Sequence, residues 1–228
     1  MKYDFDTIID RKNTNCFKYD FAAAFGKPAD AIPMWVADMD FRIPPEVTAR
    51  IKAFADFGIY GYSDAGPDYI KAVLKWFEER FDYKPERDWL VRTPGVVYAL
   101  ATAVRSLTGE GDAVIIQQPV YHPFPKVIQD NSRRLVVSEL KLENGRYEVD
   151  FEDFEKKIAA EKPKMFVLCN PHNPVGRVWT VEELKAMGEI CLKYNCLVVS
   201  DEIHCDFIHE GHRHHVFATL SPAFADNC

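Results

Sequence analysis

Apolar runs and amphipathic stretches alternate along the second half of the chain. Short apolar runs predict buried strands at 89–93, 112–117, 134–139, 165–169 and 196–200. Apolar residues at helical spacing predict helices at 96–107, at 151–160 and after Thr180. Strands that alternate with helices are typical of a mainly parallel sheet with helices on both faces. We therefore expect an α/β fold.

The first part of the chain lacks this alternation. Residues 1 to about 32 scatter Asn, Lys and Asp among aromatic residues, so we expect an irregular segment there. A helix that opens at Pro44-Pro45 is predicted to extend to about Phe57, because proline is tolerated in the first turn. A second helix is predicted at about 67–81. This pattern divides the chain into residues 1–88 and an α/β part, residues 89–228.

The stretch 165–206 has the most informative pattern. Its first apolar run is followed by a turn-rich loop, 170–176, and then by a helix with a capping box formed by Thr180 and Glu183. The next apolar run ends in Asp201. In open α/β sheets, ligands lie beyond the carboxyl ends of the strands. We therefore expect three polar residues at these strand ends to face one site: Asn170, Asn173 and Asp201.

Asp201 is the first candidate for a site residue. A carboxylate at the end of a buried strand destabilises the fold unless it is paired or hydrogen-bonded. A cationic ring nitrogen of a ligand would be a suitable partner. The alternative is a purely structural role, in which Asp201 caps a nearby helix or turn.

The turn at Pro94-Gly95 is a candidate anion site. It leads from a predicted strand into a predicted helix, and the free N–H groups of a helix start attract anions. Gly95 would allow a phosphate to approach closely. An ordinary strand-to-helix turn is the alternative. Neither a Walker loop nor a dinucleotide fingerprint is present.

Composition narrows the classes of function. The chain has 228 residues and a net charge of −7 without a long run of Lys or Arg, which argues against nucleic acid as a partner. No apolar segment is long enough to span a bilayer, and the N-terminus lacks an apolar signal core, so we expect a cytoplasmic protein. The six cysteines form no CxxC pair and are expected to be reduced.

A group of histidines follows the last predicted strand. His209, His212, His214 and His215 lie close to Cys205 in the sequence. Their spacing matches no standard zinc pattern. We therefore expect a solvated loop rich in histidine and no metal.

Five motifs together resemble one family. They are NPHNPVG, SDEIHCD, PMWVADMDF (33–41), TPGVVYAL (93–100) and QPVYHPF (118–124). In order and spacing they resemble the enzymes of fold type I (aspartate aminotransferase-like) that depend on pyridoxal 5′-phosphate (PLP). The subfamily with the closer resemblance is the MalY/PatB-type cystathionine β-lyases. The resemblance extends from the N-terminus to about residue 220.

The resemblance implies a PLP cofactor and a set of residues that bind it. Backbone N–H groups of Gly95, Val96 and Val97 would bind the phosphate, and Tyr121 would stack on the pyridine ring. Asp201 would keep the ring nitrogen protonated. Two further residues are implied: Asn173, which would donate to the ring phenolate oxygen and contact the substrate carboxylate, and His204. A polar residue satisfied at the strand end is an equal alternative for His204.

The resemblance also implies a homodimer. Tyr62, with Tyr60 as the alternative, would reach the cofactor phosphate of the neighbouring subunit. The backbone at Val36 and Ala37 would bind the substrate carboxylate. Residues 1–88 would then contribute to a small domain and the dimer interface, and residues 89–228 would form part of a PLP-binding large domain.

The resemblance leaves the catalytic lysine unassigned. The family forms a Schiff base with a lysine that follows the aspartate by about thirty residues, whereas no lysine occurs after Lys193. We therefore expect a C-terminally truncated chain that is inactive alone. In full-length form we expect a C–S β-lyase that cleaves cystathionine or cysteine conjugates to a thiol, pyruvate and ammonia. The alternatives are a class I/II aminotransferase and a non-catalytic fragment.

Overall fold

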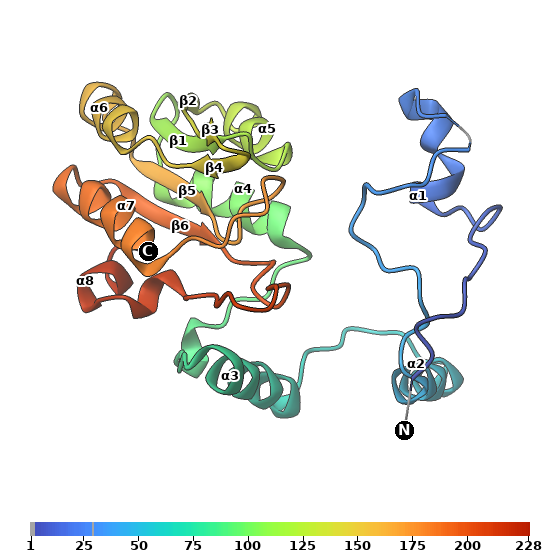
Figure 1. Cartoon of the computed structure of the whole chain (residues 1–228). Helices are drawn as coiled ribbons and strands as arrows, with labels where there is room; N and C mark the ends of the chain where they lie inside the picture. The colour runs from blue at the N-terminus through green and yellow to red at the C-terminus, as the bar shows by residue number, and fades with distance from the viewer. Residues whose placement is uncertain (1–2, 29) are drawn as a thin grey trace. The chain divides into compact units, whose positions relative to one another are not determined.

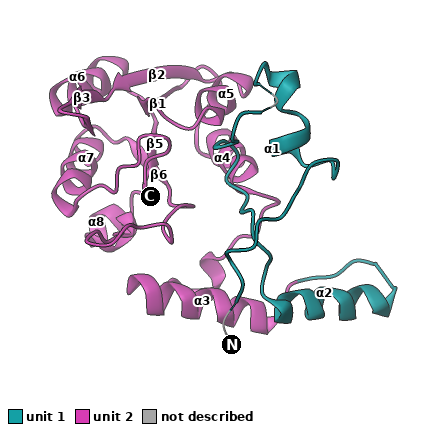
Figure 2. Cartoon of the chain, turned by 45° about the vertical axis from the view of Figure 1, so that its right-hand side comes forward, with its two compact units in different colours: residues 1–64 teal, residues 65–228 magenta. Residues whose placement is uncertain are grey.

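The computed structural model describes residues 3–28 and 30–228, and these residues form two compact units. Unit 1 comprises residues 1–64 and unit 2 residues 65–228, as Figure 2 shows by colour. The division falls between Asp64 and Ala65, so the helix at 67–81 belongs to unit 2. The functional division expected at residues 88 and 89 stays a prediction.

The elements are labelled in Figure 1. The helices and 3₁₀ turns are α1 (Phe17–Asp20), η1 (Ala22–Phe25), α2 (Pro45–Phe57), α3 (Pro67–Phe81), η2 (Arg87–Trp89), α4 (Val96–Leu107), α5 (Pro123–Asp130), α6 (Phe151–Glu161), α7 (Val181–Lys193), η3 (Phe217–Thr219) and α8 (Pro222–Ala225). The strands are β1 (Ala113–Gln118), β2 (Arg134–Glu139), β3 (Lys141–Glu143), β4 (Arg146–Glu148), β5 (Met165–Cys169) and β6 (Leu197–Asp201).

The main sheet of unit 2 is entirely parallel, with the strand order β2-β1-β5-β6. One hydrophobic core lies between the sheet and the helices α6, α7 and α8, and a second lies under α4 and α5. Helices therefore cover both faces of the sheet, and the predicted α/β class is confirmed.

Local signals explain why several elements begin where they do. Thr180 accepts the amide of Glu183, and the Glu183 carboxylate accepts the amide of Thr180, so the predicted capping box starts α7. Asp150 caps α6 by accepting the amide of Asp153. Asn144 and Gly145 both have positive φ, which closes the β3-β4 hairpin.

The structure corrects the prediction at residues 89–93. This segment is not a strand: Trp89 ends a 3₁₀ turn, and the following residues are irregular. Trp89 and Val91 are exposed, so the apolar character of the segment does not reflect a place in the sheet. The structure also adds α5, whose two prolines in the first turn hide its helical pattern in the sequence.

Unit 1 is built differently from unit 2. Its longest element is α2, preceded by a segment that contains only short turns of helix. Only Cys16 and Lys18 are buried among its described residues, 3–28 and 30–64. The predicted irregular N-terminal segment is confirmed, and unit 1 has almost no apolar core of its own.

Candidate functional site

The carboxyl ends of β5 and β6 lie side by side. Cys169 is the register partner of Asp201, and the amide of Asn170 donates to the Asp201 carbonyl over 2.9 Å. The two strand ends are thus joined at one edge of the sheet, which is the place where ligands bind in open α/β folds.

The face on which Asp201 lies follows from strand alternation. Cys169 and Val199 pack into the core under α4 and α5, and side chains two residues apart share a face. Asp201 therefore lies on the face that α4 covers. The first residue of α4, Val96, packs into the same core.

The start of α4 lies at the same edge. The helix ends shortly before β1 begins, so its C-terminus lies near the amino ends of the strands and its N-terminus near the carboxyl ends. Gly95 precedes it with a φ of 149°, a conformation available to glycine, and is exposed. Val96 is half-buried and Val97 is exposed. This first turn presents its free N–H groups on the Asp201 face of the sheet, and such groups attract anions. The predicted role of Gly95, Val96 and Val97 in phosphate binding stays a prediction.

The Asp201 carboxylate is buried with little compensation. The side chain is 8% exposed, and Oδ1 accepts the amide of Ile203 over 3.2 Å. No cation pairs with it among residues 3–28 and 30–228. Burial raises the pKa of Asp201 above its usual value, while the Ile203 amide and then the charge of His204 oppose that shift. Such a carboxylate is suited to bind a cationic group of a ligand.

Asn173 is linked to the same strand end through Cys169. Its amide donates to Cys169 Sγ over 3.4 Å, and Cys169 is the register partner of Asp201. Burial raises the pKa of the Cys169 thiol to about 12, so the thiol stays protonated at neutral pH and is not a nucleophile. The half-buried Asn173 side chain has no hydrogen-bond partner in the described part of the chain, which leaves its amide free for a ligand.

The segment after β1 completes this edge. Tyr121 is half-buried and packs against the core under α4 and α5, with its ring 6.2 Å from the Phe124 ring. His172 Nε2 lies 2.8 Å from the Pro119 carbonyl oxygen, which ties this segment to the loop after β5. Burial lowers the pKa of His172 to about 4, so the ring is neutral and serves as a structural link.

The turn after β6 carries His204 and is fixed at both ends. His204 is half-buried, with its ring against Phe207. Asp206 accepts the Trp76 indole N–H over 3.1 Å, which anchors the turn to α3. The carboxylate of Glu202 accepts the Phe217 amide over 2.9 Å. The His204 ring makes no hydrogen bond in residues 3–28 and 30–228, while its backbone carbonyl accepts the Phe207 amide over 2.9 Å. The role of the His204 side chain stays a prediction.

Sequence reasoning missed several residues that shape this edge. They are Cys169, His172, Glu202 and Asp206. Cys169 could have been found, because it ends a strand on the same face as Asp201 once the two runs are aligned. Glu202 and Asp206 depend on contacts with distant segments, and no local signal reveals them.

Three predicted residues belong to unit 1. Val36 has a φ of 52° and is exposed, as are Ala37 and Tyr62. The edge described above is made by unit 2 alone. The roles of these three residues therefore stay predictions.

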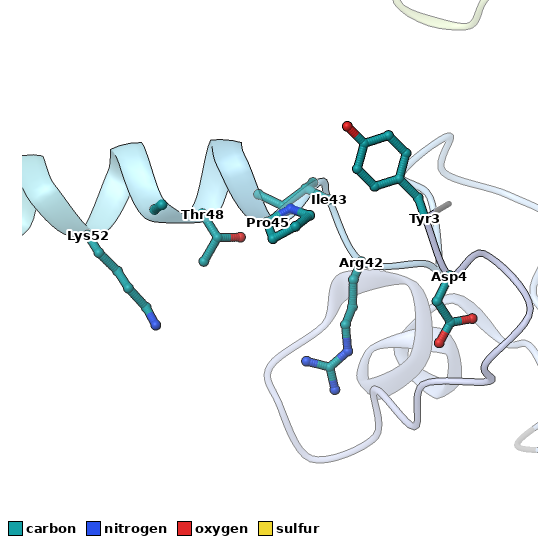
Figure 3. A pocket seen from close by; sticks show the side chains of 8 residues that line it. Tyr3, Asp4, Arg42, Ile43, Pro45, Thr48 and Lys52 are labelled. Carbon is teal, nitrogen blue, oxygen red and sulfur yellow. The ribbon is translucent and has the colours of Figure 1, made fainter. Parts of the chain in front are cut away.

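Unit 1 contains a separate cleft of about 660 Å³ at the start of α2. Figure 3 shows Thr48 and Lys52 on the helix, with Tyr3, Asp4 and Arg42 from the preceding segments. None of the residues that line it is a predicted site residue. Its size alone does not make it the functional site.

The described residues offer no ready metal site. Within residues 3–28 and 30–228 no group of three or more His, Cys, Asp or Glu side chains is arranged to hold a metal ion. The histidines after β6 have other surroundings: His214 is buried with Nε2 3.0 Å from Glu202 Oε2, and His215 is half-buried.

Comparison with known proteins shows the same relationship in sequence and in structure. The sequence matches the family described as aminotransferase class I and II over residues 30–225. It is 43% identical over 223 residues to cystathionine beta-lyase PatB of Bacillus subtilis (strain 168), a match that covers 98% of this chain and 58% of that protein.

Two solved structures are similar over nearly the whole chain. Cystalysin from Treponema denticola, whose structure contains PLP, superposes with a TM-score of 0.92 at 39% identity and covers 100% of this chain and 58% of its own. A PLP-bound C–S lyase from Staphylococcus hominis superposes with a TM-score of 0.90 at 36% identity and covers 97% of this chain and 56% of its own. The chain thus spans less than two thirds of the length of these relatives.

The helices carry no sign of a membrane span. Among the described residues, none of the helices combines the length and the apolar character that a bilayer crossing requires.

Proposed function

We propose, because the chain belongs to the aminotransferase class I and II family, that unit 2 binds PLP at the carboxyl ends of β1, β5 and β6. We propose further that the protein acts as a C–S β-lyase on cystathionine or related cysteine conjugates. One observation carries the proposal: the buried, unpaired Asp201 carboxylate lies on the face of the sheet where α4 presents its first N–H groups. A ligand with a cationic ring nitrogen and an anionic tail matches that pair of groups.

In this proposal each part of PLP is assigned to residues of unit 2. Asp201 would hold the proton on the ring nitrogen, and the amides of Gly95, Val96 and Val97 would bind the phosphate. Tyr121 would cover one side of the ring, and the free amide of Asn173 would donate to the ring oxygen. His204 lies in the turn after Asp201 and would act on the same edge of the ring. When bound, PLP supplies an electron sink for the reacting amino acid.

The proposed lyase activity rests on the similar proteins described above. The 43% identical relative is named a cystathionine beta-lyase, and both structures compared above are of C–S lyases or contain PLP. The base that removes the substrate Cα proton is unassigned, because residues 194–228 contain no lysine. An aminotransferase is the second candidate, since the matched family is named for that activity.

The proposal includes a homodimer in the cytoplasm. Tyr62 would contact the cofactor phosphate of the second copy, and the backbone of Val36 and Ala37 would bind the substrate carboxylate. Exposed apolar side chains on α2, among them Ile51 and Phe54, support an association between copies.

A PLP titration of the 228-residue chain tests the cofactor site. We expect binding that shifts the ring absorbance, and a loss of about tenfold or more in affinity when Asp201 is replaced by Asn, because the ring nitrogen then lacks its anionic partner. Pyridoxal, which lacks the phosphate, should bind more weakly than PLP to both proteins. Asp130→Asn, a surface change at the end of α5, is the matched control. Equal affinity in Asp201→Asn and the control would refute the site.

A product assay separates the two activities. The longest polypeptide that the reading frame encodes is incubated with cystathionine and PLP, with and without an added keto acid. Pyruvate and a thiol without keto acid indicate elimination, whereas amino transfer needs the keto acid. We expect the first result, and a strict dependence on keto acid would favour the aminotransferase.

A further inference from the structure

Four charged side chains of unit 1 form an ionic clasp around the segment 35–41. They are Arg11, Lys18, Asp38 and Asp40. Lys18 Nζ lies 2.6 Å from Asp40 Oδ2 and donates to the Asp38 carbonyl over 2.9 Å. Arg11 pairs with the other Asp40 oxygen at 2.7 Å and also contacts Asp38. Two cations and two anions therefore join residues 11–18 to residues 38–40.

Lys18 is the centre of this clasp. It is 5% exposed, and a buried ammonium group destabilises a fold unless its hydrogen bonds are satisfied. Its partner Asp40, through that hydrogen bond, raises the pKa of Lys18, so the lysine stays charged. The backbone carbonyl of Lys18 also accepts the Trp35 indole N–H over 3.2 Å. Lys18 thus holds both sides of the dipeptide Val36-Ala37.

The residue between these attachments has an unfavourable backbone conformation. Val36 has a φ of 52°, and a β-branched residue rarely adopts positive φ. The side chain is 42% exposed, so burial does not compensate for the strain. Strained residues of this kind persist when their surroundings over-determine them, and they concentrate at functional positions. The Trp35 attachment on one side and the clasp on the other provide that constraint.

Val36 and Ala37 present unused donors. Their amides donate to no acceptor within residues 3–28 and 30–228, and both residues are exposed. Arg11 and Lys18 are already committed to Asp38 and Asp40, so the cations do not serve as direct anion ligands. The groups left for an incoming carboxylate are the two amides.

We propose that the clasp is a positioning device that holds Val36 at positive φ, so that the amides of Val36 and Ala37 point together at a substrate carboxylate. Arg11 and Lys18 are then positioning residues that act through the backbone. The inference rests on the proposed function, which assigns the substrate carboxylate to these two amides, and it adds the side chains that set their geometry.

The first arm of the test needs no ligand. The ¹³Cα shift and the HN–Hα coupling of Val36 report its φ by nuclear magnetic resonance. In Lys18→Met both should move toward the values of an extended residue, because the constraint on Val36 is lost. Lys12→Met, a nearby exposed lysine, is the matched control and should leave them unchanged. Unchanged values in Lys18→Met would overturn the proposal.

The second arm measures carboxylate binding at the two amides. Propionate is titrated against the 228-residue chain, with propionamide as the probe that lacks the charge. We expect propionate to move the Val36 and Ala37 amide resonances, and Lys18→Met to raise the Kd by about tenfold, the effect of releasing one strained residue. Val36→Gly in the Lys18→Met background should recover part of the loss, since glycine adopts positive φ without strain.

The outcomes separate this inference from the proposed function. If propionate binds to wild type and to Lys18→Met equally, the carboxylate contact stands and the clasp does not position it. If propionate moves neither amide in wild type, the inference fails, while the PLP titration of unit 2 still decides the cofactor site. Arg11→Gln, which removes one arm of the clasp, should raise the Kd by a smaller factor and replaces Lys18→Met if that variant unfolds.

Discussion

Asp201 should make the protein less stable at neutral pH than an uncharged residue would. Its pKa is raised by burial, so the folded state binds this proton more tightly than the unfolded state. Stability from this group is therefore lost as pH rises toward the raised pKa. We expect Asp201→Asn to be more stable than wild type by about 1 kcal/mol at neutral pH. The difference should vanish below the ordinary aspartate pKa of about 3.9. Urea unfolding at both pH values measures it.

A second aspartate provides a control of opposite sign. Asp206 accepts the Trp76 indole N–H, and its Oδ1 lies 3.7 Å from Arg80 Nε. Asp206→Asn should therefore lower the free energy of unfolding at neutral pH by up to about 1 kcal/mol. If Asp201→Asn also lost stability there, its carboxylate would have to be well satisfied in the fold. The idea that it awaits a cationic ligand would then be wrong.

At the scale of single residues, the sequence indicates candidate residues better than it indicates the residues that they contact. The sequence indicates Asp201 as a candidate because a run of apolar residues ends in a carboxylate, and its role stays a prediction. The Asn173 amide bond to Cys169 Sγ depends on a tight loop geometry, and the Glu202 contacts depend on residues 214–217. The Glu202 contacts join residues that are 12 and 15 positions apart, so no short sequence window predicts them.

The start of α4 should depend on the glycine that precedes it. Gly95 has a φ of 149°, and a Cβ there would meet no atom within 4 Å, so the effect of Gly95→Ala comes from the backbone alone. We expect a loss of about 1–2 kcal/mol in stability and weaker phosphate binding at the first turn. Thermal unfolding and a phosphate titration measure the two effects.

Another helix supplies the matched control for this prediction. Gly66 also precedes its helix, α3, but has a φ of −73° and open space around its Cβ position. Gly66→Ala should change stability by only a few tenths of a kcal/mol. If the two substitutions had equal effects, the unusual backbone of Gly95 would not be what sets the anion site.

Elements with local signals were predictable, and those that depend on tertiary context were less so. Helix α3 begins at Pro67, α4 follows the Pro94-Gly95 turn, and α7 begins with a capping box, and all three signals are visible in the sequence. Residues 89–93 have the composition of a strand, yet they pair with no strand: Trp89 ends a 3₁₀ turn and residues 90–93 are irregular. Strand composition describes a tendency, whereas a strand needs a partner.

The compact units of the structure are a different division from the functional one expected at residues 88 and 89, which stays a prediction. The sequence placed the boundary where the strand-helix alternation begins, at residue 89. The compact units divide at residue 64, because α3 is anchored through Trp76 and Phe81 to the loops after β6. The alternation of predicted strands and helices identifies the sheet and the helices that cover it. The hydrophobic periodicity of the sequence does not reveal the contacts that attach α3.

The two units should contribute unequally to stability and to association. Both hydrophobic cores lie in unit 2, whereas the described part of unit 1 exposes Ile8 at 94%, Met34 at 95% and Ile32 at 85%. A polypeptide of residues 65–228 should therefore unfold cooperatively, with a Tm within a few degrees of the whole chain. Calorimetry measures this.

Sedimentation velocity of the same two polypeptides tests the association. The 228-residue chain should form dimers or larger species, because the described part of unit 1 exposes many large apolar side chains that contact between copies would bury. Residues 65–228 should sediment as a monomer. If both are monomeric, the apolar side chains of unit 1 do not drive self-association and the proposed dimer loses this support. If residues 65–228 do not unfold cooperatively, unit 2 needs unit 1 to fold, and its two cores are less independent than their composition indicates.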